Sequence, residues 1–349
     1  MSKALQSLET VTEQPYNAAT PLSVLVEEMT PTPLTYVRNH FARPELDVET
    51  WRLQIEGALN QPRSFSLGEL QNLPVTTLVL TLECAGNGRK SMDPHPKGTP
   101  WDYGAVSAIE VMGTSLSNVL ELVGLEDNVS ELSFTGADRG EVEPGRSVYY
   151  VRSLPIEVAL HPDTMLVWAM NGETLTPDHG FPLRLHVPGW YGMAAVKWLK
   201  EIRSLKEPFE GFFQNEHYVY REESGTPEAE PVREMRVRSL IAQPLDDESL
   251  KLGAIEIAGL AWSGKGEITQ VEINVDGGVS WQTAEFEQAK SKFAPQPWRF
   301  QWKPDRVGAY ILRSRATDSA GETQPYEQRW NRLGYGNNGV QNITVEFLA

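Results

Sequence analysis

A change in composition at residues 221–234 divides the chain into two parts. Glu, Pro, Gly and Ser crowd together there and large apolar residues are few, which is typical of a linker between domains. The chain has 349 residues, more than one hydrophobic core usually supports. We therefore predict a tail at residues 1–20, a first domain at 21–220, a linker at 221–235 and a second domain at 236–349.

The first domain alternates between short strand-like and short helix-like segments, the pattern of a mixed α/β unit. Ser66 and Glu69 are spaced as a capping box and Pro74 follows them, so we predict a short helix between Ser66 and Pro74. A second helix is predicted at residues 118–123, where Gly124 would end it. Ser153 followed by Pro155 predicts a third helix, which would end before His161.

Beyond the linker, apolar and polar residues alternate with the period of a β-strand. The alternation covers residues 271–275, 300–302, 310–316 and 343–347, and the turn sequence Asp276-Gly277-Gly278 follows the first of these segments. Short strands separated by turns predict an all-β immunoglobulin-like sandwich of roughly 100 residues. The predicted fold class is therefore α+β, a mixed α/β domain followed by a β-sandwich.

The charge balance argues against polyanionic partners. The chain has 31 Lys and Arg against 47 Asp and Glu, a formal net charge of −16, whereas nucleic acids and anionic membranes attract clustered positive charge. No apolar run is long enough to span a bilayer, and residues 1–20 lack the basic and apolar parts of a secretory signal. We expect no nucleic-acid partner, no membrane partner and a cytoplasmic location.

Two glycine patterns resemble nucleotide-binding motifs in the wrong context. Gly334, Gly336 and Gly339 match G-x-G-x-x-G, but a β pattern follows them instead of the helix that such a loop requires. Residues 259–265 approach a phosphate-binding loop, yet Gly266 stands where a hydroxyl ligand of Mg²⁺ is needed. We do not expect a nucleotide site at either pattern.

Cys84, the only cysteine, follows a predicted buried strand at residues 75–83 and opens a loop that contains Gly86, Gly88 and Arg89. A nearby cation favours the thiolate, which is the form that acts as nucleophile or metal ligand. A lone cysteine is also often a small buried hydrophobe, so Cys84 alone leaves both interpretations open.

Several motifs, in order along the chain, resemble the sulfite oxidase family, and together they cover about residues 30 to 349. The resemblance in the first domain is carried by Tyr36-Val37-Arg38-Asn39-His40, Glu83-Cys84-Ala85-Gly86-Asn87-Gly88-Arg89, His179-Gly180-Phe181-Pro182-Leu183-Arg184, Val187-Pro188-Gly189-Trp190-Tyr191-Gly192 and Val196-Lys197-Trp198-Leu199. Ala261-Trp262-Ser263-Gly264, residues 271–281, Trp330-Asn331 and Asn337-Asn338 resemble the dimerisation domain of that family.

The resemblance implies a molybdenum cofactor. Cys84 would be the protein thiolate on molybdenum, whose other ligands are oxo groups and the dithiolene sulfurs of molybdopterin. Soft thiolate coordination suits such a metal. The residues that would hold the pterin and its phosphate are Asn39, His40, Asp138, His179, Arg184, Ala195, Val196 and Lys197.

The same resemblance implies oxidation of sulfite to sulfate. Arg38 and Arg89 match the arginines on the substrate side, and Tyr218 matches a tyrosine that donates a hydrogen bond near the metal. The chain has no Cys-x-x-Cys-His for a haem, so electrons would pass to an external acceptor. The second domain would pair two subunits as a homodimer.

Two departures from the family concern the substrate side. Gly88 stands where vertebrate members carry a second arginine, and a further arginine that the second domain should supply has no clear counterpart, since residues 293–299 diverge.

Three alternatives remain open from the sequence. One is a molybdenum oxidoreductase for another oxyanion or for an S- or N-oxide. Another is a non-catalytic binding or assembly protein, which would leave the convergence of Cys84, Arg38 and Arg89 unexplained. A zinc hydrolase is the third, although no Cys-x-x-Cys or His-Glu-x-x-His spacing is present for it.

Overall fold

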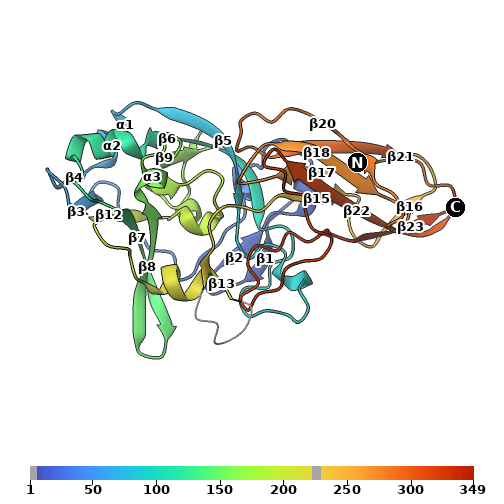
Figure 1. The fold of residues 1–349 in the computed structure, drawn as a ribbon, viewed down its shortest axis with the longest axis horizontal. Helices are drawn as coiled ribbons and strands as arrows, with labels where there is room; N and C mark the ends of the chain where they lie inside the picture. Colours follow the sequence, from blue (N-terminus) through green and yellow to red (C-terminus); the bar gives the residue numbers. More distant parts are fainter. Residues whose placement is uncertain (1–5, 222–228) are drawn as a thin grey trace.

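The chain folds into two lobes that lie along the long axis of the molecule (Figure 1). The computed structural model describes residues 6–221 and 229–349, so residues 222–228 of the predicted linker lie outside the described residues. Strands predominate in both lobes and helices are few and short, and the predicted α+β fold class is confirmed. None of the described helices is long and apolar enough to cross a bilayer.

Two five-stranded sheets build the first lobe. One has the order β4-β3-β12-β7-β8, with β3 and β12 parallel, and the other has the order β10-β9-β6-β5, with β11 paired to β9. Their strands are β3 (Leu53–Gly57), β4 (Arg63–Phe65), β5 (Thr76–Glu83), β6 (Val106–Ser115), β7 (Glu131–Glu143), β8 (Arg146–Pro155), β9 (Met165–Met170), β10 (Glu173–Thr174), β11 (Arg184–His186) and β12 (Leu199–Leu205).

All three predicted helices of the first lobe are confirmed. In α1 (Leu67–Gln71), the Ser66 side chain accepts a hydrogen bond from the Glu69 N–H and the Glu69 carboxylate accepts one from the Ser66 N–H, which completes the capping box. The second helix, α2 (Leu116–Val123), begins two residues earlier than predicted and ends at Gly124. The third helix, α3 (Ile156–Ala159), has a single turn and ends before His161, as predicted.

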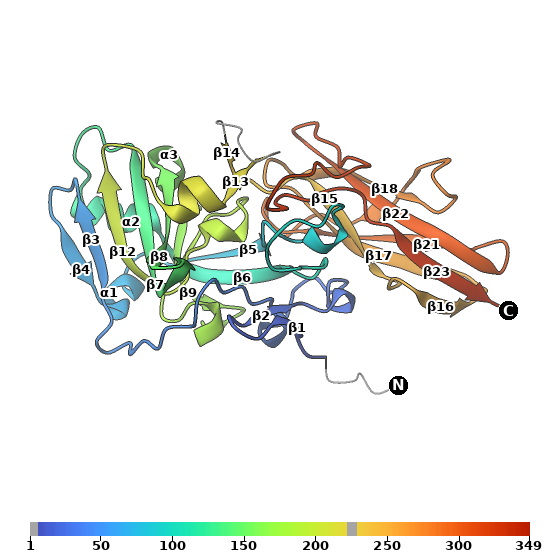
Figure 2. The ribbon, with the colours of Figure 1, turned by 90° about the horizontal axis from the view of Figure 1, so that it is seen from below.

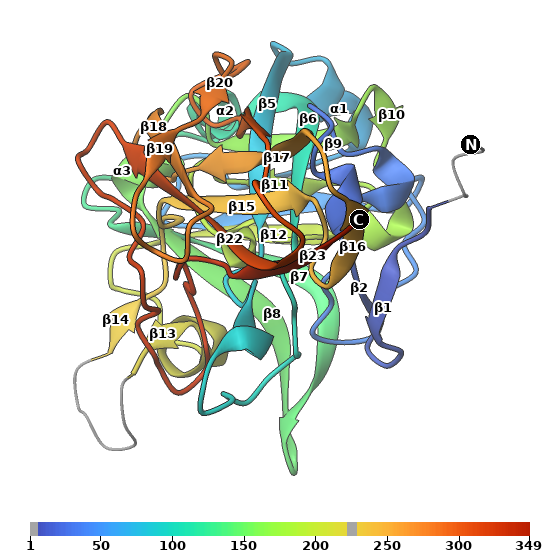
Figure 3. The same ribbon diagram turned by 90° about the vertical axis from the view of Figure 1, so that its right-hand side faces the viewer.

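The second lobe contains two sheets packed around one apolar core (Figure 3). The orders are β15-β17-β21-β20 and β16-β23-β22-β18-β19. The four predicted alternating segments lie in strands of these sheets, except that Val275 follows the last residue of its strand. The bounds are β15 (Arg238–Gln243), β16 (Glu248–Lys251), β17 (Ile255–Trp262), β18 (Ile268–Asn274), β19 (Gln282–Thr283), β20 (Glu285–Phe286), β21 (Gln296–Trp302), β22 (Gly308–Asp318) and β23 (Ile343–Leu348).

Two short hairpins lie outside these sheets. β1 (Glu9–Thr12) pairs with β2 (Asn17–Ala19), and this hairpin lies near the junction of the lobes (Figure 2). Part of the predicted N-terminal tail is therefore folded. β13 (Val219–Tyr220) pairs with β14 (Glu230–Pro231) on either side of residues 222–228.

Strand β5 runs toward the second lobe and ends at the predicted metal ligand (Figure 1). Its first residues are exposed and its last four are buried, so the predicted buried strand is confirmed for its C-terminal half. The Thr81 N–H donates to the Phe293 carbonyl (2.8 Å), and the Ser291 hydroxyl donates to the Val79 carbonyl (2.5 Å). The second lobe thus holds the strand that positions Cys84.

A buried ion pair joins the lobes at the end of β5. The Arg238 guanidinium lies 2.9 Å from the Glu83 carboxylate, and both side chains are 1% exposed. The Trp262 indole and the Asn87 amide donate further hydrogen bonds to this carboxylate, at 2.9 and 3.0 Å. Burial raises the pKa of Glu83, and Arg238 opposes that rise.

Candidate active site

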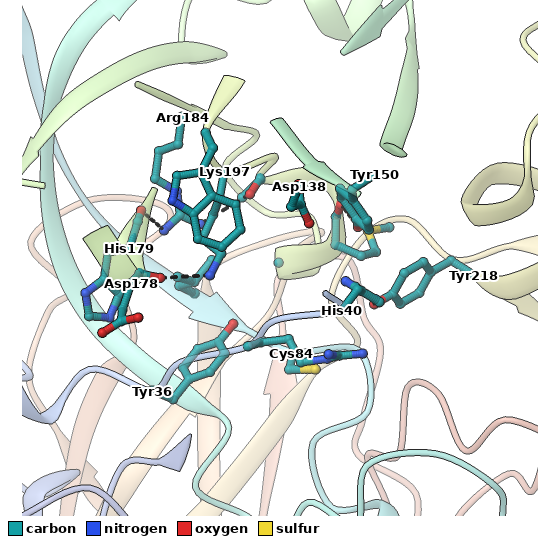
Figure 4. Close-up of a pocket in the computed structure, with 16 residues that line it drawn as sticks. Tyr36, His40, Cys84, Asp138, Tyr150, Asp178, His179, Arg184, Lys197 and Tyr218 are labelled. Atoms are coloured by element: carbon teal, nitrogen blue, oxygen red, sulfur yellow. Dashed lines mark hydrogen bonds between the residues drawn. The ribbon is translucent and has the colours of Figure 1, made fainter. Parts of the chain in front are cut away.

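Two cavities meet where β5 ends, and Arg38, Cys84 and Tyr218 line both of them. The first cavity, shown in Figure 4, is also lined by Tyr36, His40, Asp138, Tyr150, Asp178, His179, Arg184, Ala195 and Lys197. The second cavity, of about 220 Å³, is also lined by Arg89, Lys97, Thr99, His217, Leu333 and Tyr335.

Cys84 lies on the wall between these cavities. Its N–H donates to the Ala105 carbonyl, and its own carbonyl accepts from the Asn87 N–H, each at 2.9 Å, so the loop backbone around it is fixed. The residue is free of disulfide bonding and 7% exposed. Although it belongs to an apolar cluster with Leu82 and Ala195, it borders both cavities and has the Arg38 side chain beside it.

Arg184 is a buried cation with incomplete hydrogen bonding. Its guanidinium donates to the carbonyls of His179 (3.0 Å) and Ala195 (3.3 Å), while its Nε has no partner among the described residues. Burial lowers the pKa of Arg184 to about 10, so it remains charged at neutral pH. A buried cation without a counter-charge favours an anionic ligand.

Lys197 is the second buried cation of the first cavity. Its amine donates to the Asn39 side-chain oxygen and to the Asp178 carbonyl, the latter at 2.8 Å. Burial and Arg184 lower the pKa of Lys197, while Asp138 raises it, so an anion bound nearby would favour its charged form. Asn39, which was predicted to bind the cofactor, is not among the described residues that line the cavity, but its hydrogen bond orients Lys197.

Both histidines of the first cavity are neutral. Burial lowers the pKa of His179 to about 4, with Lys197 and Arg184 adding to the effect. Its Nδ1 is 2.7 Å from the Thr176 hydroxyl, which fixes the ring. Burial and Arg38 lower the pKa of His40, whose Nε2 is 2.8 Å from the Tyr218 hydroxyl. These rings can therefore donate or accept hydrogen bonds without adding charge.

Asp138 is the carboxylate of the first cavity that departs most from ordinary behaviour. Burial raises the pKa of Asp138 to about 6, although Lys197 opposes the rise.

Of the two other residues predicted to contact the cofactor, Ala195 and Val196, only the first borders the cavity among the described residues. Ala195 lines the cavity, whereas the Val196 N–H donates to Ala194 and the Val196 carbonyl accepts from Leu185, at 3.0 and 2.9 Å.

The second cavity, which Cys84 borders, is also lined by two guanidinium groups. The Arg89 guanidinium is held by the carbonyls of Leu333 (2.8 Å) and Thr99 (2.6 Å). Arg38 reaches the same cavity and donates to the Asn39 carbonyl. Two fixed guanidinium groups next to a sulfur could hold a small oxyanion there.

Tyr218 follows a π-helical turn at Phe212–His217 and lies between the cavities. Burial raises the pKa of Tyr218, so the phenol stays protonated and can donate a hydrogen bond.

Several lining residues were not anticipated. Tyr150 and Asp178 belong to the first cavity, and His217 and Tyr335 to the second. His217 could have been suspected because it directly precedes Tyr218 in the sequence. Tyr335 could have been suspected because it lies between Gly334 and Gly336, two glycines that the rejected nucleotide motif left unexplained. The second domain contributes Leu333 and Tyr335 to the second cavity, while Phe293 contacts the middle of β5 instead.

The donor set of the first cavity fits the implied cofactor. Arg184 and Lys197 supply buried positive charge for a phosphate, and the unpartnered Arg184 Nε leaves a donor free for it. Cys84 supplies one soft sulfur at the far wall.

Two domain families match the chain. Residues 40–213 match the oxidoreductase molybdopterin binding domain, and residues 229–347 match the Mo-co oxidoreductase dimerisation domain.

Relatives that are similar over nearly the whole of this chain agree with these matches. Human mitochondrial sulfite oxidase is 33% identical over 97% of this chain, and the chain spans 66% of that protein. Sulfite oxidase from Arabidopsis thaliana is 33% identical over 97% of this chain and 94% of its own length. A nitrate reductase from Hordeum vulgare is 34% identical over 93% of this chain and 40% of its own length.

Among solved structures, the sulfane dehydrogenase SoxCD from Paracoccus pantotrophus has a TM-score of 0.85 and 30% identity, covering 97% of this chain and 86% of its own chain. The family matches and this structural similarity together cover both lobes of the chain. The chain belongs to the sulfite oxidase family of oxidoreductases, whose cofactor is molybdenum bound by molybdopterin.

Proposed function

We propose that this protein oxidises sulfite to sulfate and passes the electrons to an external acceptor. The observation that carries the proposal is the position of Cys84 on the wall shared by a cavity suited to an anionic cofactor and a smaller cavity with two arginines. When bound, the cofactor supplies oxygen-atom transfer and accepts two electrons. In the overall reaction, sulfite and water give sulfate, two protons and two electrons.

In this proposal the first cavity holds the cofactor. Cys84 provides the sulfur ligand, while Arg184 and Lys197 bind the phosphate, with His179 and His40 as neutral hydrogen-bonding partners. Arginine suits that role because its planar group can bind two phosphate oxygens at once. Asn39 acts through Lys197, whose amine donates to its side-chain oxygen.

The second cavity holds the substrate. Arg38 and Arg89 orient the oxyanion with its sulfur lone pair toward the wall that carries Cys84. Because the substrate is held in this orientation, the reaction no longer depends on a random encounter in solution. Tyr218 donates a hydrogen bond at that wall and does not titrate near neutral pH, because burial raises the pKa of its phenol.

A direct assay tests the proposal. Purified protein loaded with the cofactor should reduce ferricyanide when sulfite is added, and the rate should saturate with sulfite. Loading is verified by elemental analysis and by extraction of the pterin. Fully loaded protein that gives no sulfite-dependent reduction would overturn the proposal.

A second candidate is reduction or oxidation of another oxyanion or of an S- or N-oxide. The similarity to a plant nitrate reductase favours it. Under the same loading, nitrate-dependent oxidation of a reduced viologen dye without sulfite oxidation would select this candidate.

We also propose that the protein is a homodimer paired through the second domain, which matches a dimerisation family. The predicted cytoplasmic location remains a prediction that fractionation of cells can test.

A further inference from the structure

A loop of the second domain closes one side of the second cavity. The Asn331 side chain bonds both backbone polar groups of Tyr335, at 2.7 and 2.9 Å, and the Gly336 N–H donates to the Ala85 carbonyl at 2.8 Å. The loop is therefore fixed to the backbone next to Cys84.

The glycines of this loop are explained by close packing. Gly334 and Gly336 have φ values of +62° and +60°, which glycine adopts at little cost. A Cβ at Gly334 would lie 2.8 Å from the Arg89 side chain, and one at Gly336 would lie 2.5 Å from the Tyr220 hydroxyl. The pattern that resembles a nucleotide motif thus brings Tyr335 against the cavity.

Tyr335 contacts three groups of the second cavity at once. Its ring stacks on Tyr218, with centroids 5.0 Å apart, and lies 5.3 Å from the Arg89 guanidinium. Its hydroxyl is 2.8 Å from Nδ1 of His217. Among the described residues, His217 Nε2 has no hydrogen-bond partner, although the residue lines the cavity.

We propose that His217 binds the substrate oxyanion as a neutral hydrogen-bond donor, and that Tyr335 of the second domain positions it by fixing its tautomer. This inference rests on the proposed function, because it takes the second cavity to be the substrate site. The ligand class is a small oxyanion, bound jointly by His217, Arg38 and Arg89.

The tautomer follows from the protonation state of the tyrosine. Burial raises the pKa of Tyr335, so its hydroxyl keeps its proton, and His217 Nδ1 is the one acceptor within hydrogen-bond distance among the described residues. With Nδ1 accepting, the ring proton resides on Nε2, which is the nitrogen left to the cavity.

His217 is neutral for a reason separate from this hydrogen bond. Burial lowers its pKa to about 4, and Arg38, Arg89 and Arg152 add to the effect. The arginines already supply the positive charge of this cavity, so a neutral hydrogen-bond donor would contribute by fixing the orientation of the bound oxyanion.

The test compares two single-hydroxyl deletions in the second domain. Tyr335→Phe keeps the ring stacking and removes the bond to His217. Tyr310→Phe is the matched control, since its hydroxyl bonds Asp305 elsewhere in that domain at 2.8 Å. With cofactor-loaded protein, Tyr335→Phe should raise KM for sulfite by about three- to tenfold with kcat within about twofold, and Tyr310→Phe should change neither.

Substitutions of His217 test the donor itself. His217→Gln can place an amide N–H near the position of Nε2, whereas His217→Asn reaches only the position of Nδ1. We expect Gln to keep KM within about threefold and Asn to raise it by about tenfold or more. Equal effects of the two variants, or an unchanged KM in Tyr335→Phe, would refute the inference.

Sulfate binding separates this inference from the proposed function. Isothermal titration of the loaded protein with sulfate reports on the cavity whether or not sulfite is oxidised. A weaker sulfate affinity in His217→Asn but not in His217→Gln supports the inference even if sulfite proves not to be the substrate, and equal affinities contradict it.

Discussion

At the scale of single residues, Glu83 and Cys84 are neighbours in sequence with different partners. Glu83 is buried against Arg238 and Trp262 of the second lobe, and Cys84 faces the two cavities. Since side chains alternate across a strand, the end of β5 can anchor the second lobe and present a sulfur at the same time. Changes at the two positions should therefore be separable.

Cys84→Ser should abolish turnover while the fold is kept. Oxygen is a poor substitute for a soft sulfur ligand, and the exchange is nearly isosteric, so we expect at least about a 100-fold loss of kcat with stability within about 1 kcal/mol. Turnover, metal content and urea unfolding of the same preparation check this. Retained turnover in a fully loaded serine variant would refute the role of Cys84.

Arg238→Met should destabilise the protein. Removal of one partner leaves the Glu83 carboxylate buried with only its neutral donors, which typically costs about 3–5 kcal/mol. The matched control is Lys265→Met, which breaks an exposed pair with Glu322 and should cost about 0–1 kcal/mol. Urea unfolding curves compare the two, and equal losses would argue against a buried anchor.

At the scale of elements, the sequence predicts best where one face of an element is solvated. The alternating strands β18, β22 and β23 and the capped helix α1 agree with their patterns. Strands β15 and β17 were missed because both of their faces are buried. In β15, Leu240 packs into the core of the first lobe and Ile241 into that of the second, so no alternation shows.

The turn after β18 gives a pH prediction. Hydrogen bonds from Ser280, followed by those from Asn274 and Val279, lower the pKa of Asp276 to about 2. A carboxylate with a lowered pKa stabilises the fold above its ordinary pKa near 4, and this contribution is lost as the pH falls through 2. From about pH 5 to about pH 2.5, the urea midpoint of the wild type should therefore fall more than that of Asp276→Asn. Equal decreases of the urea midpoint in the wild type and in Asp276→Asn would contradict a stabilising role of the Asp276 carboxylate.

At the scale of the whole molecule, the two lobes share the site unequally. The motifs that resemble the family placed Cys84, Arg38, Arg89 and Tyr218 in the chain, and all four border the second cavity. The residues that the second lobe places in this cavity could not be predicted. Tyr335 reaches the cavity through contacts with residues far away in the sequence, and local sequence patterns do not reveal such contacts. His217 directly precedes Tyr218 in the sequence, but its hydrogen bond to Tyr335 forms only in the folded chain.

The dimer belongs to this scale as well. One chain has a mass of 39.0 kDa. Sedimentation velocity at micromolar concentration should give twice this mass, because the second domain matches a dimerisation family. The cofactor-free protein should behave in the same way, since the second domain lies apart from the first cavity. A monomer under both conditions would contradict the proposed assembly.

The unequal sharing of the two cavities has a consequence for how the enzyme matures. The first cavity is lined by residues between Tyr36 and Tyr218, whereas the second also needs Leu333 and Tyr335 near the C-terminus. A nascent chain therefore emerges from the ribosome with the complete lining of the first cavity well before the last wall of the second is synthesised. Under the proposed function, the lining of the cofactor cavity is therefore synthesised in full before that of the substrate cavity.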